Sequence, residues 1–344
     1  MKKQLFFLLC LFVLSAVNAQ VSIGARHVGK QKKFPKGRLD KFKKTETIFV
    51  LSDIIDANTY KEILDSSWDI TPYKLMYRKD FNLLDYTVGD YSFANLEGYH
   101  ITKEMESGGK LEYLYIYINF FMLDGEGLEN DLSKLDKSSS RYKKKYEKAF
   151  ESNKIKLARV DLFPKDTFVP TALREKSSVI MDSIYNKDVF YNYKTGFLKN
   201  YFQKVNNQLK SGQEYWMYEN DFLPELKKLA KHTLYIPNYH FIKYNPWKRK
   251  ASKDKEGFEK VIENYKYKFE FQDKNEIDRR ILSGEEFYYL RYVRVNAQKF
   301  VHIVNSKTGE IVYRNYIAGV MSSYNLKSRH IENINSKIKK ALKK

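Results

Sequence analysis

The sequence predicts an α/β (α+β) fold of two tandem modules, each a mixed sheet covered by helices. The first observation is residues 47–53 (TIFVLSD), a short apolar, β-branched run closed by a Ser-Asp turn, which is typical of a central strand. The second is the alternation of such strands with segments of helical spacing. The third is that a similar series begins again at residue 233 (TLYIP).

Composition and pattern divide the 344 residues into five segments. We expect a signal peptide at 1–19, a basic irregular arm at 20–44 and a first α/β module at 45–170. A connector with helices is expected at 171–231. A second α/β module with a C-terminal helix, at 232–344, completes the predicted organisation.

The first segment has the layout of a secretory signal peptide. Lys2 and Lys3 precede an apolar run, and Val-Asn-Ala precedes Gln20, which predicts cleavage after Ala19. A membrane anchor is the alternative, but about 13 apolar residues fall short of the roughly 20 that span a bilayer. We therefore expect export to the periplasm or the outer surface, with no transmembrane segment after cleavage. Cleavage would also remove Cys10, the only cysteine, and with it any disulfide or thiolate nucleophile.

The chain is strongly basic, with a formal net charge of +20 that loss of Lys2 and Lys3 would lower to +18. In an intracellular protein this charge would indicate nucleic acid, but export removes that partner. We expect instead an anionic envelope surface or another envelope protein. Solvated lysine-rich faces without a partner are the other interpretation. The six histidines lack metal-ligand spacing, so we predict no metal and no cofactor.

In the first series, Asp56 begins a helix that places Tyr60, Ile63 and Leu64 on one face. The other elements expected there are strands at 70–78, 91–101, 111–123 and 155–163 and a short helix at 81–88. Residues 124–131 (DGEGLEND) are acidic and rich in glycine. Their spacing does not match a calcium-binding EF-hand, so we expect a solvated loop.

The second series follows an unpatterned connector and ends in an amphipathic helix over 323–344, with Ile331, Ile334, Ile338 and Leu342 on one face. Helices at 195–209 and 223–231 are expected before this series. Within it, before the final helix, we expect helices at 258–265 and 276–282 and strands at 266–271, 286–295, 299–304 and 311–317. Gly309 suits a left-handed turn position before the last strand.

Three short strings of the first series match strings of the second. They are residues 47–50 with 233–236, 73–81 with 267–275, and 111–116 with 298–303. The intervals between them differ, so duplication and chance both account for the match. Duplication predicts that the two sheets share strand order and direction.

The string FVHIVNSKTGEIVY at 300–313, with YNLKS at 324–328, resembles uncharacterised exported proteins of Bacteroidota. No activity is carried over from this resemblance. The succession of strand, helix, strand and Lys-Thr-Gly-Glu hairpin is also similar to periplasmic domains of the curli-secretion lipoprotein kind. It is similar too to the amino-terminal domain of the Tol system's periplasmic translocation protein. That similarity implies a fold and nothing further.

The chain lacks the sequence motifs of common catalytic sites. It has no Gly-x-Ser-x-Gly, no His-Glu-x-x-His and no glycine-rich phosphate loop. We therefore predict a non-catalytic binding or scaffold component of the cell envelope. The alternative is a hydrolase of envelope polysaccharide or peptidoglycan, in which two of Asp53, Glu97 and Asp161 would act as paired carboxylates.

The candidate ligand-binding residues are Trp247, Lys248, Arg249 and Lys250, in an insertion that the first series lacks. A tryptophan among cations can lie on an anionic or glycan surface, where stacking and charge act together. The alternative is a solvated loop with Trp247 folded back on the core.

Overall fold

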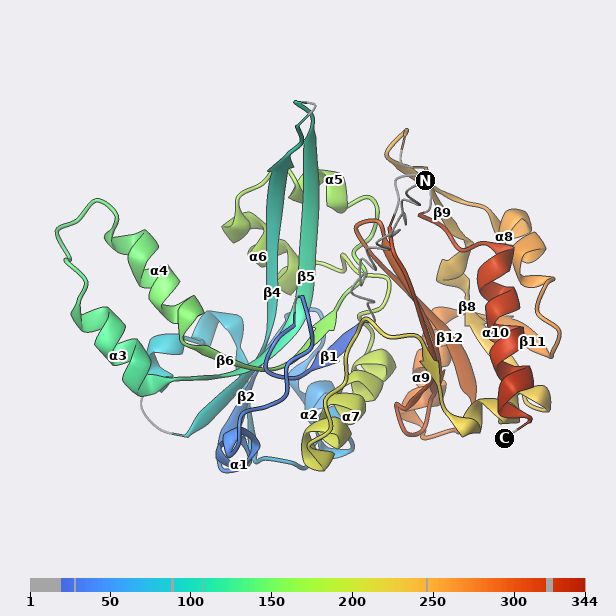
Figure 1. The fold of residues 1–344 in the computed structure, drawn as a ribbon, viewed down its shortest axis with the longest axis horizontal. Coiled ribbons are helices and arrows are strands. Elements are labelled where there is room, and N and C mark those ends of the chain that lie inside the picture. Colours follow the sequence, from blue (N-terminus) through green and yellow to red (C-terminus); the bar gives the residue numbers. More distant parts are fainter. Residues whose placement is uncertain are drawn as a thin grey trace, which may run out of the picture.

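A computed structural model of the chain describes residues 20–27, 29–87, 90–106, 108–245, 247–319 and 324–343. The expected signal peptide, 1–19, lies outside these residues. Two modules lie side by side, each built on a six-stranded mixed sheet (Figure 1). This confirms the predicted α/β architecture of two modules.

The two sheets have the same strand order and the same strand directions. Starting from equivalent edges, the first sheet has the order β1-β6-β5-β4-β2-β3 and the second has the order β7-β14-β13-β12-β8-β11. In each, three neighbouring strands are parallel and the remaining pairs are antiparallel. The matched strings fall on equivalent strands, as duplication predicts. The strands of the first sheet are β1 (Val21–Ile23), β2 (Glu46–Leu51), β3 (Tyr73–Tyr77), β4 (Tyr91–Glu104), β5 (Lys110–Leu123) and β6 (Lys154–Asp161). Those of the second are β7 (Asp221–Phe222), β8 (Leu234–Pro237), β11 (Phe269–Gln272), β12 (Tyr288–Val295), β13 (Gln298–Asn305) and β14 (Ile311–Ile317).

The helices also correspond between the modules. α2 (Ala57–Asp65) and α8 (Lys255–Ile262) each connect the second strand to the edge strand, and α7 (Thr195–Ser211) and α10 (Ser328–Ala341) each follow the last long strand. The other helices are α1 (Arg38–Phe42), α3 (Gly125–Ser133), α4 (Tyr142–Ser152), α5 (Val169–Ala172), α6 (Ser177–Asn186) and α9 (Lys274–Leu282). Short 3-10 turns occur at Arg78–Asp80, Leu83–Tyr86, Pro224–Ala230 and Asn238–Phe241. A separate hairpin of β9 (Ile242–Asn245) and β10 (Lys250–Lys253) occupies the predicted insertion.

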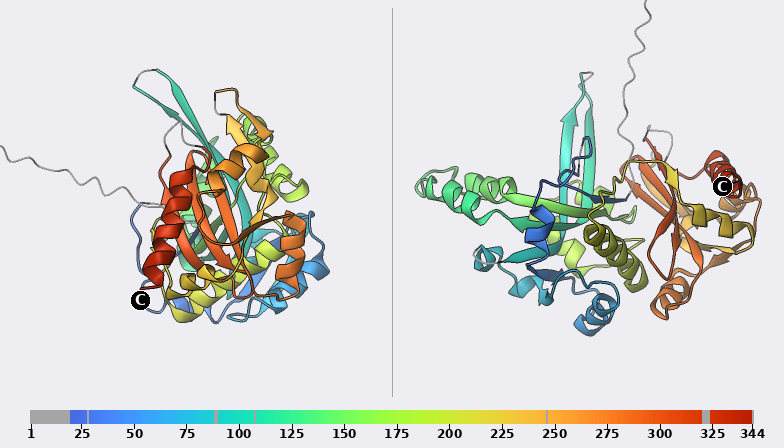
Figure 2. Two further views of the ribbon diagram at one scale, coloured as in Figure 1. Left: turned by 90° about the vertical axis from the view of Figure 1, so that its right-hand side faces the viewer. Right: turned by 60° about the horizontal axis from the view of Figure 1, so that its bottom comes forward.

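Helices and sheets alternate in four layers, and α7 lies in the layer between the two sheets (Figures 1 and 2). Phe202 on one side of α7 packs against Phe49 of β2, with ring centroids 5.4 Å apart. Phe197 on the other side packs against Tyr289 of β12, at 5.6 Å. The second sheet is covered in turn by α10, since the Tyr313 hydroxyl donates to Asn333 Oδ1 at 2.9 Å.

The second module caps the start of α7. Lys194, at the N-cap position, supplies no side-chain hydrogen bond. Asp278 of α9 replaces it: its Oδ1 accepts from the Gly196 amide at 2.6 Å and its Oδ2 from the Thr195 hydroxyl at 2.6 Å. A carboxylate at a helix N-terminus satisfies free amides and complements the helix dipole. The two modules are therefore joined through this helix.

Several segments differ from the sequence expectation. Residues 124–131 begin α3 rather than forming a loop, because Asp124 accepts from the Gly127 amide as an N-cap. The expected irregular arm contains β1 and α1, and the unpatterned connector contains α6. Leu342, expected on the buried face of the last helix, follows the end of α10 and is 53% exposed, although Ile331, Ile334 and Ile338 are buried as expected. Over the described ranges no group of acidic, His or Cys side chains is arranged to hold a metal.

None of the helices in the described part of the chain combines the length and the apolar character needed to cross a bilayer.

Candidate ligand-binding cleft

Two hairpins from different modules project on the same side of the molecule (Figures 1 and 2). One is the outer part of β4 and β5, which extends beyond the rest of the first sheet. The other is the β9–β10 hairpin. Side chains of β5 alternate between faces, so that Leu114 and Ile116 are buried while Tyr113 and Tyr115 on the opposite face are half-buried. These tyrosines face a cavity at the junction of the modules.

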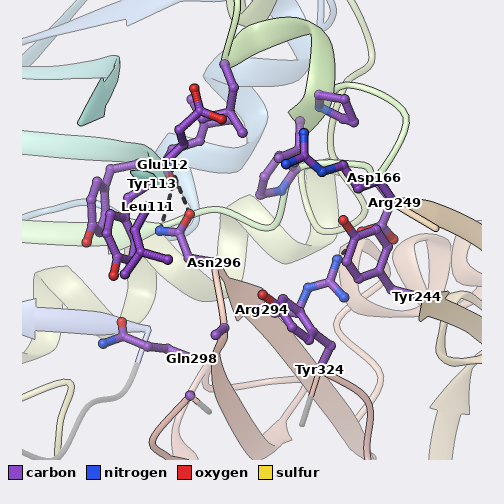
Figure 3. A pocket seen from close by; sticks show the side chains of 18 of the residues that line it. Leu111, Glu112, Tyr113, Asp166, Tyr244, Arg249, Arg294, Asn296, Gln298 and Tyr324 are labelled. Carbon is purple, nitrogen blue, oxygen red and sulfur yellow. Dashed lines mark hydrogen bonds and ion pairs between the residues drawn. The ribbon is translucent and has the colours of Figure 1, made fainter. Parts of the chain in front are cut away.

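The cavity has a volume of about 710 Å³ and is lined by both modules; it is called the inter-module cleft below. Two other hollows, of about 750 and 450 Å³, belong to the first module alone. Half-buried or exposed aromatic and cationic side chains in the cleft include Tyr113, Tyr115, Tyr244, Trp247, Arg249 and Tyr316. Figure 3 shows Tyr113 and Gln298 on one side, Tyr244, Arg249 and Tyr324 on the other, and Asn296 between them.

A buried ion pair joins the modules at the cleft. Arg294 of β12 contacts Asp166, which follows β6, and both side chains are buried. The guanidinium also lies over the rings of Tyr244 and Tyr324, 4.4 and 5.4 Å from their centroids. Burial raises the pKa of Asp166, and Arg294 opposes that rise. The Asp166 carboxylate is thus occupied by a structural contact.

Asn296 fixes the distance between the first module's hairpin and the second sheet. It occupies the turn between β12 and β13 with φ 56°, a left-handed conformation that asparagine tolerates. Its Oδ1 accepts from the Leu114 amide at 2.9 Å, and its Nδ2 donates to the Leu114 carbonyl at 3.1 Å. Asn325 makes the same two bonds to the backbone of Tyr244, each 2.9 Å long. Both walls of the cleft are therefore held by side-chain amides.

The aromatic wall is formed by the hairpin tyrosines. The rings of Tyr113 and Tyr115 are 6.4 Å apart and inclined by 23°. Tyr99 on the paired strand lies 5.5 Å from Tyr115, inclined by 30°. Tyr113 and Tyr115 thus form a stacked, half-buried aromatic pair. The Lys103 ammonium lies 5.7 Å from the centroid of the Tyr113 ring, and the Arg159 guanidinium lies 5.8 Å from that of Tyr115.

The structure separates the four predicted binding residues. Trp247 and Arg249 line the cleft, whereas Lys248 and Lys250 are exposed and are not among its lining residues. Trp247 is 80% exposed, so the alternative in which it folds back on the core is wrong. Asn245 orders this turn, because its Oδ1 accepts from the amides of Trp247 and Lys248, both at 3.0 Å. Arg249 follows with φ 49°.

The carboxylates considered for hydrolysis lie outside the cleft. Glu97 and Asp161 share one face of the first sheet, since both are paired in register with Tyr117. Glu97 is bound by Lys154 at 2.8 Å and Asp161 by Arg159 at 2.5 Å. Burial raises the pKa of Asp161 despite Arg159. Burial has the same effect on Glu97, but the charge of Lys154 and hydrogen bonds from Lys154, Asn119 and Tyr117 together outweigh it and leave the pKa lowered. Asp53 is exposed, in the turn after β2.

Sequence reasoning identified Trp247 and Arg249 but not Arg294, Asn296 or the hairpin tyrosines. A local signal existed for Asn296, since asparagine in a two-residue hairpin connection favours a left-handed turn. No local signal joins Arg294 to Asp166, because they lie 128 residues apart.

Comparison of the chain with protein-family models, curated proteins and solved structures found no match. Its function is therefore inferred from the geometry of the cleft and from the sequence.

Proposed function

We propose that the protein is an exported component of the cell envelope with a non-catalytic binding or scaffold role. The observation that carries this proposal is the inter-module cleft, whose accessible lining includes several aromatic and cationic side chains. Export to the periplasm or outer surface is supported by the composition of residues 1–19. The expected partner is an anionic envelope surface or polymer, which matches the formal net charge of +20.

A binding role accounts for the cleft better than hydrolysis does. Glycoside hydrolysis needs two carboxyl groups about 5 to 9.5 Å apart, both facing the substrate. The described lining of the cleft contains Asp166 and Glu112, and Asp166 is buried in its ion pair with Arg294. Concave sites with aromatic walls and a few fixed polar groups are typical of ligand binding.

The test is to express the chain with its own N-terminus in a Gram-negative host. Mass spectrometry of envelope-purified protein should find Gln20, or its cyclised form, at the N-terminus. The purified protein should bind isolated anionic envelope fragments at low salt and release them at about 1 M salt, where the screening length is about 3 Å. Lys248→Ser/Arg249→Ser/Lys250→Ser should bind more weakly.

Two results would contradict the proposal. Retention of Met1 in envelope-purified protein would overturn export. Binding by the triple variant equal to that of the parent at low salt would remove the basic hairpin from the binding surface.

A further inference from the structure

We propose that the inter-module cleft binds an acidic oligosaccharide, with sugar rings on Tyr113 and Tyr115 and a sugar carboxylate on Arg249. The inference rests on the proposed function and names the chemical class of its ligand. It depends on three features of the cleft: an aromatic wall, an arginine that forms no ion pair with the described residues, and a recessed shape.

The aromatic wall suits the face of a sugar ring. Tyr113 and Tyr115 lie on the same face of β5 with rings inclined by only 23°, and both are half-buried, so that part of each ring meets solvent. The faces of aromatic rings carry partial negative charge. They attract the weakly positive C–H groups that cover one face of a pyranose. Successive rings along a strand can therefore support successive sugars.

Among the described residues that line the cleft, Arg249 is the cation available to an acidic group. Arg294 is occupied by Asp166, and Lys110 lies 3.8 Å from Glu104 in an exposed pair. No carboxylate of the described residues lies within ion-pair distance of Arg249, which lines the cleft on the side opposite Tyr113 (Figure 3). A guanidinium binds a carboxylate through two parallel hydrogen bonds. The backbone of Arg249 is left-handed, with φ 49°, and follows the turn that Asn245 orders.

Polar groups suited to hydroxyls complete the lining. The amide of Gln298 can both donate and accept, and the carboxylate of Glu112 can accept. Hydroxyl groups of a sugar need both kinds of partner. Glu112 would repel a densely charged polymer, so sugars that carry one carboxylate per residue or fewer fit better than polyphosphates.

The shape of the cleft favours a chain molecule over a flat membrane. A volume of about 710 Å³ lies within the usual range of about 300 to 1,000 Å³ for ligand pockets. A flat bilayer surface does not enter a recess of this kind. A membrane would instead meet Lys248 and Lys250, which are exposed outside the cleft. These two lysines therefore distinguish the two kinds of partner.

The test measures binding of uronic-acid oligosaccharides by calorimetry and by intrinsic tryptophan fluorescence, since Trp247 is the exposed one of the chain's three tryptophans. The probes are short oligomers of galacturonate, mannuronate and hyaluronan, each compared with its carboxyl-reduced form at fixed salt. At least one acidic oligomer should bind, and its reduced form about tenfold or more weakly, a difference of about 1.4 kcal/mol. Arg249→Ser and Tyr113→Ala should each weaken binding to a similar degree.

The matched control is Lys248→Ser/Lys250→Ser, which removes two charges beside the cleft and should stay within about twofold of the parent. Arg249 is exposed, so its replacement leaves the fold intact and keeps the test valid if Tyr113→Ala misfolds. Equal binding by Arg249→Ser and the parent, or no binding of any acidic oligomer, would overturn the ligand class. Binding to phosphatidylglycerol vesicles that only the lysine variant loses would overturn the ligand class and leave the proposed function standing.

Discussion

Four buried histidines, His27, His240, His302 and His330, are kept neutral by their surroundings. Burial lowers the pKa of His330 to about 4, and Lys299, Arg329 and Lys327 add to the effect. Burial lowers the pKa of His27 to about 3 and that of His240 to about 4. Burial also lowers the pKa of His302 well below its usual value, and Arg291, Arg314 and Lys204 add to the effect. His302 is paired in register with Arg291 on one side and Arg314 on the other, so a neutral ring separates two cations. Protonation there would place three positive charges in one row.

The first prediction is that the free energy of unfolding falls as pH decreases below about 6.5. Above this pH the histidines are neutral in both states. Below it the unfolded chain takes up protons that the folded chain does not, which costs about 1.4 kcal/mol per pH unit for each histidine until the folded pKa is reached. His302→Gln should therefore lose less stability between pH 7.5 and 5.5 than the parent, measured by urea unfolding. An unchanged pH dependence would mean that His302 is already protonated in the fold.

At the scale of single residues, sequence reasoning found exposed side chains and missed buried partners. Trp247 and Arg249 are recognisable because stacking and charge are properties of the residues themselves. The roles of Asn296 and Arg294 arise only where the second sheet meets the first module's hairpin and the loop after β6. Such contacts depend on the packing of distant segments, which residue type alone does not specify.

Among the elements, α7 depends on the second module for its first turn. The contacts from Asp278 to Thr195 and Gly196 replace a local cap. The second prediction is that Asp278→Ala lowers the free energy of unfolding by about 1 to 2 kcal/mol, the usual cost of losing an N-cap. Asp278→Asn should cost less, because an amide oxygen still accepts one bond.

The control is Glu259→Ala, which breaks an exposed pair with Lys255 at 3.5 Å and should change stability by less than about 1 kcal/mol. Equal effects of Asp278→Ala and Glu259→Ala in chemical unfolding would mean that the cap contributes nothing beyond a surface charge.

Elements with strong periodicity were predicted, and those ordered by tertiary contacts were not. The α7 stripe and the aromatic strands follow from spacing alone. In contrast, α6 has no side-chain cap and contains Val179 and Ile180, which have modest helix propensity. It is held by burial of Ile180 and Ile184 against β4 at Gly98, where an added Cβ would lie 3.2 and 3.3 Å from their side chains. Packing of this kind overrides propensity.

In the whole molecule, the junction between modules carries a buried ion pair, and its loss should be costly. The third prediction is that Asp166→Ala lowers the free energy of unfolding by about 3 to 5 kcal/mol, because Arg294 would remain buried without its partner. Asp166→Ala/Arg294→Met should recover much of this loss. Chemical unfolding of the two single variants and the double variant measures the coupling. Additive effects of the two changes would show that the pair is not coupled.

The sequence predicted two modules and matched their equivalent strands, but it did not predict where the modules meet. Strand strings such as residues 47–50 and 233–236 report on local structure, which is the same in both halves. The cleft depends instead on what differs: the long β4–β5 hairpin of one module and the β9–β10 insertion of the other. The role of such differences between the modules becomes clear only when the relative placement of the two modules is known.

The four-layer order has a consequence for assembly. Each module presents helices on one side and a sheet face on the other, and the helices of the first cover the sheet of the second, so the packing is head-to-tail. Head-to-tail packing can in principle add one module after another, and repeat proteins of this kind end in a unit whose outer face is polar. Here α10 serves as that terminus: its outward side carries Glu332, Lys339 and Lys340, all exposed. A third unit packed on α10 would have to bury these charges.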